Sequence, residues 1–283
     1  MTLIMKGSEV AAGMKAKILD ELHTLSFTPT LAVIRVGSRP DDLAYERGIL
    51  KRFDSLGLNV KVHELDANIS QSEFDSAFMN INNDSNIHGI LLFRPLPEGL
   101  SDEFAVSHVD PMKDVDCMSD SNIAGVFAGK SECFAPCTAG AVMEMLSHYD
   151  ISLQGLNVAV VGRSMVIGRP IAMMMMKQNA TVTICHTKTK NLQEICRRSD
   201  VIIAAAGKAL MLTRDYVNEN SIIVDVGINV VSNGKLCGDV DFENVSSCVK
   251  AISPVPGGVG AVTTSVLAEH VVRAAKFKEE ISK

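Results

Sequence analysis

Short runs of β-branched and aliphatic residues alternate along the chain with longer segments in which apolar residues recur every three or four positions. Uninterrupted apolar runs are typical of strands buried on both faces, and the longer segments are typical of amphipathic helices. We expect strands at 29–37, 59–65, 88–93, 157–162, 181–185, 201–207 and 221–227. We expect helices at about 7–25, 41–56, 71–82, from 167 onwards, and at 190–198 and 262–280. The alternation predicts the α/β class, with parallel sheets covered by helices on both faces.

The alternation falls into two halves, separated by a polar stretch around residues 128–138. A chain of 283 residues is long enough for two domains of ordinary size. The sequence therefore predicts two α/β domains with a boundary near this stretch.

Composition limits the classes of function. Hydrophobic residues make up 47% and charged residues 21%, and the net charge is −6 with the basic residues scattered. These values favour a globular protein with a large core and argue against nucleic acid or a membrane surface as partners. The seven cysteines include no C-x-x-C pair, which favours the reducing cytoplasm. Cys133 and Cys137 have no accompanying histidine or second pair, so we expect no metal site.

The second half holds a glycine turn, VVGRSMVIGRP at 160–170, between an expected strand and an expected helix. Gly162 and Gly168 are six positions apart, unlike the dinucleotide spacing G-x-G-x-x-G, and a glycine after a strand is often only a tight turn. However, this turn opens a β-α-β unit, where free backbone N–H groups can bind a phosphate. The next strand ends in His-Thr-Lys (186–188), where NAD-binding folds usually carry an acid. Together with Arg163 these side chains favour the 2′-phosphate of NADP; the alternative is that the cations are solvated surface charges.

A second glycine-rich segment, SPVPGGVGAVTT at 253–264, follows an expected strand. Its prolines stiffen the entry, and its glycines allow another backbone to come close. We expect a ligand-facing loop, with Thr263 or Thr264 capping the last helix. Gly207 and Gly227 also end strands, at the edge where open α/β sheets bind ligands.

The acidic stretch DPMKDVD holds Asp110, Asp114 and Asp116. Carboxylates this close together can act as acid and base or bind a cation. From the spacing alone, a solvated turn is the better interpretation.

These stretches together resemble one family, the bifunctional methylenetetrahydrofolate dehydrogenase/cyclohydrolases, over nearly the whole chain. The combination of PVPGGVG with the GRS-x-x-x-G-R-P turn is highly specific. The other matching stretches are VGSRPDDLAY (36–45), GILLFRPLP (89–97), PMKDVD (111–116), APCT (135–138), HTKTKNL (186–192) and VDVGIN (224–229).

The resemblance implies oxidation of 5,10-methylenetetrahydrofolate to 5,10-methenyltetrahydrofolate with NADP⁺, and hydrolysis of that product to 10-formyltetrahydrofolate. It implies a tetrahydrofolate domain at 1–139, on which the C-terminal helix 262–283 packs back. It also implies a Rossmann-like NADP domain at 140–261, with a folate cleft between the two domains. A cytoplasmic homodimer that takes tetrahydrofolate derivatives as substrates is expected.

The resemblance also assigns roles to single residues. Asp116 matches the carboxylate that hydrogen-bonds the pterin ring, which replaces the solvated-turn interpretation at this position, and Tyr45 matches the aromatic residue that stacks on the folate. The substrate-binding residues that it implies are Tyr45, Asp116, Pro256, Gly257 and Thr263. The cofactor-binding residues that it implies are Gly162, Arg163, Ser164, Gly168, His186, Thr187, Lys188, Gly207 and Ile228.

Two catalytic positions depart from the family pattern. A family lysine that assists water attack on the methenyl carbon follows the tyrosine by four residues on the same helix face, and this position is Ile49. The family glutamine that contacts this lysine is Phe93. Lys51 faces elsewhere around the helix, Arg52 cannot give up a proton, and Arg94 should point away if its strand continues. We therefore expect a dehydrogenase whose cyclohydrolase activity is weak or absent.

Three alternatives remain open at this point. The protein could be fully bifunctional through another base. A shikimate-dehydrogenase-like oxidoreductase would carry a Lys and Asp pair and no PVPGGVG loop. A non-catalytic folate- or NADP-binding homologue would bind without turnover, which an assay with methylenetetrahydrofolate can test.

Overall fold

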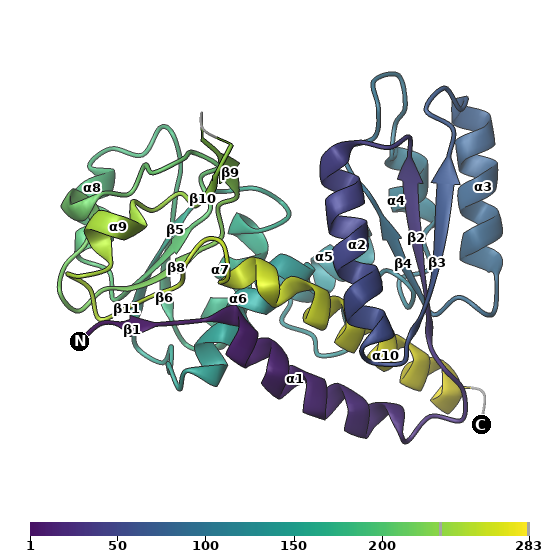
Figure 1. The fold of residues 1–283 in the computed structure, drawn as a ribbon, viewed down its shortest axis with the longest axis horizontal. Helices are drawn as coiled ribbons and strands as arrows, with labels where there is room; N and C mark the ends of the chain where they lie inside the picture. The colour runs from purple at the N-terminus through teal and green to yellow at the C-terminus, as the bar shows by residue number, and fades with distance from the viewer. Residues whose placement is uncertain (232–233, 282–283) are drawn as a thin grey trace. The chain divides into compact units, whose positions relative to one another are not determined.

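The computed structural model describes residues 1–231 and 234–281, which form two compact units (Figure 1). The first, called here the six-stranded unit, comprises Met1–Gly13 and Thr138–Thr263. The second, called the three-stranded unit, comprises Met14–Cys137 and the C-terminal helix from Thr264 onwards. The predicted α/β class, with two domains and parallel sheets, is confirmed.

The six-stranded unit is built on a parallel sheet. Its strands are β1 (Leu3–Ile4), β5 (Asn157–Val161), β6 (Thr181–Cys185), β7 (Val201–Ala204), β8 (Ile222–Asp225) and β11 (Ala251–Ile252). They lie in the order β1-β11-β8-β7-β5-β6. From β5 the chain first adds β6 on one side and then β7 on the other, so the strand order reverses at β5. In open α/β sheets, ligands bind outside the carboxyl ends of the strands at such a switch point.

Helices and a small hairpin complete this unit. They are α6 (Cys137–His148), α7 (Gly168–Lys177), α8 (Leu192–Arg197), α9 (Phe242–Val245), the 3₁₀ turns η1 (Arg214–Tyr216) and η2 (Val259–Ala261), and the antiparallel strands β9 (Asn229–Val230) and β10 (Leu236–Cys237). On one face of the sheet, Val161, Ala204 and Ile223 pack in a buried cluster with Cys196 of α8 and Val245 of α9. Burial of the aliphatic runs on both faces explains why these segments form central strands.

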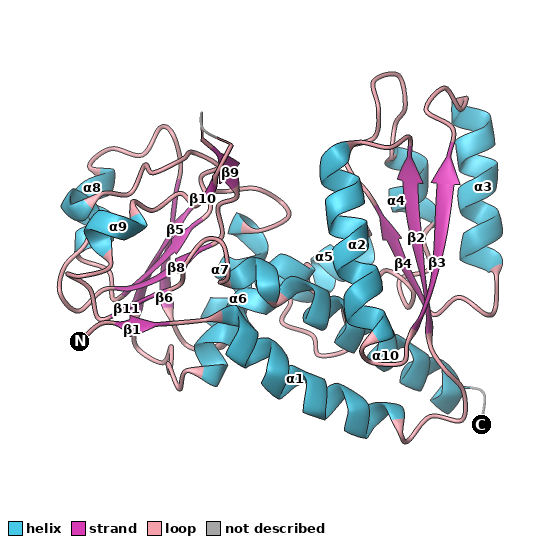
Figure 2. Ribbon diagram, viewed as in Figure 1, coloured by secondary structure: helices cyan, strands magenta, loops and turns pink. Residues whose placement is uncertain are grey.

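The three-stranded unit holds a parallel sheet of β2 (Thr30–Val36), β3 (Asn59–Leu65) and β4 (Gly89–Leu92), in the order β3-β2-β4. Its helices are α2 (Pro40–Asp54), α3 (Gln71–Asn83), α4 (Glu103–His108), α5 (Asp120–Phe127) and α10 (Thr263–Ile281), together with the second part of α1 (Gly7–Leu22). Figure 2 shows α2 and α3 on opposite sides of the sheet.

The two faces of this smaller sheet are packed differently. Ile34 and the aromatic rings of Phe74 and Phe78 form a buried cluster that joins β2 to α3. On β4, a Cβ added at Gly89 would lie 2.8 Å from Val271 of α10, so this helix packs closely against the strand. Glycine at position 89 is therefore required by the packing.

The structure departs from the sequence prediction mainly in short elements. Strands of two residues and helices α4, α5, α6 and α9 were not predicted, and the helix expected at 7–25 ends at Leu22. Residues 1–13, expected in the first domain, belong to the six-stranded unit because Leu3 and Ile4 pair with Ala251 and Ile252. Residues 282–283 of the expected last helix lie outside the described residues.

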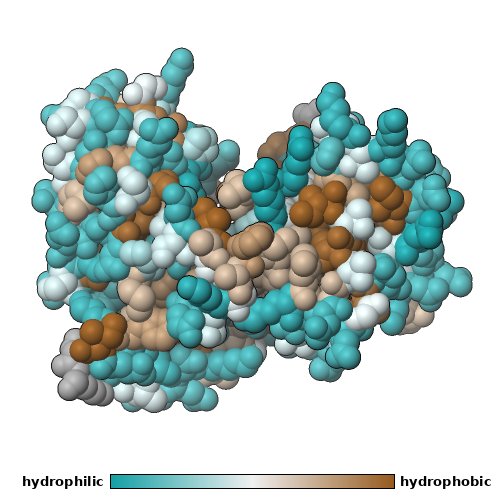
Figure 3. All heavy atoms as spheres, turned by 180° about the vertical axis from the view of Figure 1, so that it is seen from behind, coloured by the Kyte–Doolittle hydropathy of each residue, from teal (hydrophilic) through white to brown (hydrophobic). Residues whose placement is uncertain are grey.

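Polar and charged side chains cover most of the face seen in Figure 3, with hydrophobic atoms in scattered groups. Within the described part of the chain, no helix is both long enough and apolar enough to cross a membrane.

Candidate active site

The glycine turn at the carboxyl end of β5 is closed by contacts that exclude side chains. A Cβ added at Gly162 would overlap the carbonyl oxygen of Ala205, and one added at Gly168 would overlap that of Gly162. The Ser164 hydroxyl accepts hydrogen bonds from the N–H groups of Ile167 (3.1 Å) and Gly168 (3.4 Å). The six-residue spacing therefore reflects a longer turn that folds back on its first glycine before α7 begins.

A pocket of about 270 Å³ lies beside this turn, where β5, β6 and β7 end. It is lined by Val161, Gly162, Arg163, Ser164, His186, Thr187, Leu192, Ala205, Ala206 and Met211. Five residues predicted to bind a cofactor thus surround one cavity. None of these lining residues is acidic, and Arg163 is cationic. The lining suits an anionic group such as a phosphate.

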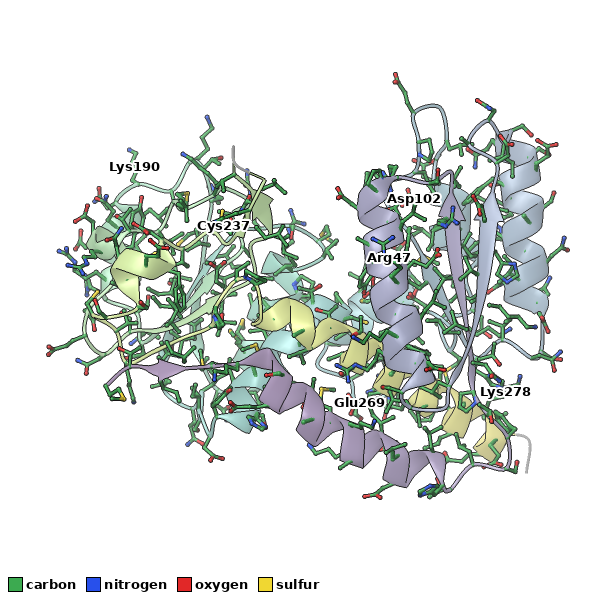
Figure 4. The ribbon with its side chains drawn as sticks, viewed as in Figure 1. Arg47, Asp102, Lys190, Cys237, Glu269 and Lys278 are labelled. Carbon is green, nitrogen blue, oxygen red and sulfur yellow. The ribbon has the colours of Figure 1, made fainter. Side chains whose placement is uncertain are left out.

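The loop after β6 is held by its own hydrogen bonds. The His186 N–H donates to the Thr189 hydroxyl (2.8 Å), and the Lys188 N–H donates to His186 Nδ1 (3.1 Å). Thr187 and Lys188 are therefore presented on a fixed, exposed loop, which Lys190 continues (Figure 4). Lys188 is not among the residues that line the pocket, in contrast to Thr187.

The other predicted cofactor residues lie on neighbouring strand ends. Gly207 has a φ of +65° on the exposed loop after β7, and Ile228 is 68% exposed after β8. Two buried carboxylates beneath these loops, Asp225 and Asp239, were missed by sequence reasoning. The signal that could have found them is an acid directly next to valine, in VDVGIN and GDVDF.

In the three-stranded unit, α2 presents Tyr45 beside the end of β4. The Tyr45 and Phe93 ring centroids are 5.6 Å apart, with 30° between the ring planes. Ile49, one turn further along α2, is fully buried, and Phe93 is buried as well. The two departures from the family pattern are therefore apolar side chains within the protein interior, next to the half-exposed Tyr45.

Asp116 lies close to Tyr45. Its Oδ1 accepts a hydrogen bond from the Cys137 N–H (2.9 Å), at the start of α6. Burial raises the pKa of Asp116, opposed by this N–H and by the Arg94 guanidinium. Desolvation of the phenol, followed by the neighbouring Cys137 and Asp116, raises the pKa of Tyr45 well above its ordinary value, although 36% of this residue is exposed. Tyr45 and Asp116 therefore share one electrostatic environment within this unit.

The direction of the Arg94 side chain was expected to be away from the site only if its strand continued. This condition is not met, because β4 ends at Leu92. The positive charge of Arg94 is the smallest of the effects that oppose the rise in the pKa of Asp116 caused by burial. Its Nη1 also forms an ion pair with Asp102 (3.3 Å), which precedes α4. Arg47 projects from α2 (Figure 4).

The three aspartates of the acidic stretch have separate surroundings. Asp114 is fully buried, and its Oδ2 accepts hydrogen bonds from the Ser119 N–H (2.9 Å), the Ser119 hydroxyl (2.7 Å) and Asn122 Nδ2 (2.9 Å). Asp110 accepts a hydrogen bond from the Met112 N–H (2.9 Å). Among the described residues, no three His, Cys, Asp or Glu side chains are grouped so as to hold a metal ion.

A buried histidine that the sequence did not single out supports the Asp116 segment. His270 Nδ1 is 2.9 Å from the Val115 carbonyl oxygen and 3.8 Å from Cys137 Sγ, and this thiol donates to the same carbonyl (3.3 Å). Burial lowers the pKa of His270 to about 3, so the ring is neutral and its Nδ1–H donates to Val115. The backbone next to Asp116 is thus fixed from two helices.

The proline-glycine loop at 253–264 is anchored at its base. The Gly7 N–H donates to the Gly257 carbonyl oxygen (2.8 Å), and Gly257 has a φ of +100°. Pro256 and Gly257 are exposed, whereas Thr263 is buried and its hydroxyl donates to the Val259 carbonyl oxygen (3.3 Å). The exposed tip at Pro256 and Gly257 is available to a ligand. Thr263 instead lies buried where the loop joins the start of α10, with its hydroxyl bonded inside the loop.

Comparison with known proteins matches both parts of the chain. The catalytic-domain model of tetrahydrofolate dehydrogenase/cyclohydrolase matches residues 5–116, and the NAD(P)-binding-domain model of the same family matches residues 136–279. The bifunctional protein FolD 1 of Desulfitobacterium hafniense is 48% identical over 279 residues, which cover 98% of this chain and 99% of that protein.

Solved structures agree with this result. The bifunctional FolD enzyme of Campylobacter jejuni is 37% identical, with a TM-score of 0.95 over 98% of this chain and 100% of that one. The FolD protein of Trypanosoma brucei, solved in complex with NADP and an inhibitor, is 29% identical, with a TM-score of 0.92 over 98% of each chain. Since the family models and close relatives span nearly the whole sequence, the chain belongs to the tetrahydrofolate dehydrogenase/cyclohydrolase family.

Proposed function

We propose that this protein oxidises 5,10-methylenetetrahydrofolate to 5,10-methenyltetrahydrofolate with NADP⁺. The observation that carries the proposal is the pocket at the end of β5, in which Arg163, Thr187 and the turn backbone surround one cavity with no acidic lining residue. The turn N–H groups suit the pyrophosphate, and Arg163 with Thr187 suits the 2′-phosphate. An NAD site would be expected to carry an acid for the ribose hydroxyl instead.

We assign cofactor binding to the six-stranded unit and folate binding to the three-stranded unit. The Tyr45 ring offers a stacking surface, and the Asp116 carboxylate can accept hydrogen bonds from N–H groups of the pterin. Pro256 and Gly257, at the exposed tip of their loop, are proposed as further folate-binding residues. Cys137, Val115 and His270 act by holding Asp116 in place.

In the proposed reaction, a C–H bond of the methylene carbon breaks and the hydrogen leaves with its electron pair. Bound NADP⁺ would supply the acceptor for this hydride, and its loss would leave the folate as the methenyl cation. The step requires no protein base, so the protein contributes mainly by holding the two rings in position. Tyr45 and Asp116 position the folate, and the turn and Arg163 position the cofactor.

We further propose that the cyclohydrolase activity is weak or absent. Water attack on the methenyl carbon needs a group that takes up a proton. The family position for this group is the buried Ile49, and the position of the glutamine that contacts it is the buried Phe93. Arg94 is the cation near Asp116, and arginine does not give up its proton near neutral pH. The product would then pass to solvent or to a separate hydrolase.

A second candidate is a fully bifunctional enzyme that uses another base. It is favoured by the names of the relatives, which describe bifunctional FolD proteins. Supplying methenyltetrahydrofolate and comparing its loss with the spontaneous rate separates the two candidates. Loss at the spontaneous rate supports the dehydrogenase alone, and fast enzyme-dependent loss supports full bifunctionality.

The proposed assembly is a cytoplasmic homodimer. Apolar side chains on the β9–β10 hairpin support an association surface, since Val230 is 68% and Leu236 49% exposed. Sedimentation of the purified protein tests this point, and a monomer at all concentrations would contradict it.

The experiment that tests the dehydrogenase follows NADPH formation from NADP⁺ and methylenetetrahydrofolate. We expect turnover with this substrate and none with shikimate. Binding of NADP⁺ and folate without turnover would support the non-catalytic homologue instead.

A further inference from the structure

The buried carboxylate of Asp239 gathers four N–H donors from two loops. Its Oδ2 accepts hydrogen bonds from the N–H groups of Ala206 (2.6 Å) and Gly207 (2.9 Å). Its Oδ1 accepts from the Lys208 N–H (2.8 Å) and from Asn229 Nδ2 (2.9 Å). The first three donors belong to the loop after β7, and Asn229 begins β9, just after β8. One carboxylate therefore ties together the loops at the ends of two adjacent strands.

Asp225, at the end of β8, holds the backbone that carries Asp239. Its Oδ1 accepts from the N–H groups of Gly227 (3.0 Å) and Asp239 (3.1 Å), and its Oδ2 accepts from the Val240 N–H (2.9 Å). A Cβ added at Gly227 would overlap the Asp239 carboxylate, and one added at Gly238 would overlap that of Asp225. The backbone at Gly227 and Gly238 thus packs directly against the two carboxylates and leaves no room for a side chain at either glycine.

The loops that Asp239 joins lie on one side of the switch point. Arg163 and Thr187 place the adenosine end of the cofactor at β5 and β6 in the proposed function. A dinucleotide that crosses the carboxyl end of β5 then extends its other half towards β7 and β8. The loop after β7 already contributes Ala205 and Ala206 to the pocket wall. The nicotinamide half would therefore lie against residues 206–208 and Asn229, which are the segments that Asp239 holds.

We propose that Asp239 is a positioning residue for hydride transfer, because it fixes residues 206–208 and Asn229 as one surface against the nicotinamide half of the cofactor. The proposal rests on the proposed dehydrogenase function and deepens it. It separates two roles within one unit: Arg163 and Thr187 give affinity for the phosphate, and Asp239 gives the orientation of the reacting ring.

The test uses Asp239→Asn, which keeps the side-chain size but brings an amide N–H group among converging donors. We expect kcat for methylenetetrahydrofolate oxidation to fall about 10²-fold, since small displacements of reacting groups have effects of this size. The affinity for adenosine 2′,5′-bisphosphate, which probes only the adenosine end, should stay within about twofold, because Arg163 and Thr187, which bind the 2′-phosphate in the proposed function, are not among the four hydrogen-bond donors to Asp239.

Asp200→Asn is the matched control. Asp200 also accepts a hydrogen bond from a backbone N–H in this unit, that of Asn157 (2.8 Å), but at the amino ends of β5 and β7. It should leave kcat and affinity for the bisphosphate unchanged. If Asp239→Asn does not fold, Asn229→Ala keeps both carboxylates and removes one hydrogen bond to a charged group, and a fall in kcat of about tenfold is expected.

A selective fall in kcat supports the proposal. Equal losses of kcat and of bisphosphate affinity, or no change in either, would overturn it and leave the dehydrogenase assignment intact. Absence of turnover in the unmodified protein would overturn the proposed function itself and, with it, this inference.

Discussion

At the scale of single residues, Arg163 decides the choice between NADP and NAD. Its guanidinium lines the pocket, and charge-assisted hydrogen bonds to phosphate are about twice as strong as neutral ones. Arg163→Ala should weaken NADP⁺ binding about 10- to 100-fold, since one such bond contributes about 1.5–3 kcal/mol. NAD⁺, which has no 2′-phosphate, should be affected far less. Steady-state kinetics with both cofactors measures the difference.

Arg169→Ala is the control for this change, because Arg169 is an exposed arginine at the start of α7 and is not among the lining residues. It should leave the preference between the cofactors unaltered. Equal weakening of both cofactors by Arg163→Ala would remove the guanidinium from the 2′-phosphate site.

Ile49 and Phe93 are the two residues to which we attribute the weak or absent cyclohydrolase activity. The double variant Ile49→Lys with Phe93→Gln should gain hydrolysis of methenyltetrahydrofolate above the spontaneous rate. Burial at position 49 lowers the pKa of a lysine, which makes it a better proton acceptor near neutral pH. Loss of the methenyl absorbance measures the gain. Leu50→Lys, at an exposed position of the same helix, should gain nothing, and equal hydrolysis by both variants would contradict the assignment.

Some residues could be predicted from the sequence, and others could not. The sequence singled out the glycine turn, Arg163 and Thr187 because they lie in one local motif, and the structure gathers them around one pocket. It left the direction of the Arg94 side chain open, since that direction depends on where β4 ends. It overlooked Asp239, whose partners at 206–208 come from a distant segment of the chain.

At the scale of elements, two glycines should respond in opposite ways to alanine. Gly168 is the first residue of α7 and packs against the glycine turn. A Cβ added there would lie 2.8 Å from the Arg163 Cα, and this backbone atom cannot move away. We expect a loss of about 1–3 kcal/mol in unfolding free energy and weaker NADP⁺ binding. Gly48, exposed within α2, has no atom within 4 Å of such a Cβ.

Gly48→Ala should therefore stabilise the protein by about 0.5–1 kcal/mol, because glycine weakens helix interiors. Thermal unfolding of both variants checks the pair. A stable Gly168→Ala variant with normal cofactor affinity would show that the turn tolerates a side chain and is not the close approach described above.

Long elements were predictable because each carries its own pattern of apolar residues, as in β2, β5 and β7. The two-residue strands were not. β1 forms only because Leu3 and Ile4 pair with Ala251 and Ile252, near the other end of the sequence. The residues next to Leu3 and Ile4 in the sequence do not indicate this pairing. For the same reason, the first 13 residues were assigned to the other domain.

At the scale of the whole molecule, Asp225 gives stability a specific pH dependence. Burial raises its pKa from 3.8 to about 6, and the nearby Asp239 carboxylate adds to the shift. Because the folded state holds this proton more tightly, the stabilising contribution is complete below pH 4 and is lost as the pH rises through 6. A rise of this size in the pKa corresponds to about 3 kcal/mol in the free energy of unfolding.

Asp225→Asn should remove this decline. Hydrogen exchange of the β7 and β8 amides, which reports on the six-stranded unit alone, should show a flatter pH dependence for the variant than for the unmodified protein between about pH 4 and pH 7. Identical slopes in both proteins would mean that Asp225 does not titrate in this range.

The most direct test of the whole account is one reaction mixture of the purified protein with NADP⁺ and methylenetetrahydrofolate, in which NADPH and methenyltetrahydrofolate are followed together. We expect NADPH to form together with an equal amount of methenyltetrahydrofolate, which then decays only at its spontaneous rate. Absence of NADPH would contradict the dehydrogenase assignment. NADPH formation with rapid conversion of the methenyl product to 10-formyltetrahydrofolate would contradict the loss of cyclohydrolase activity.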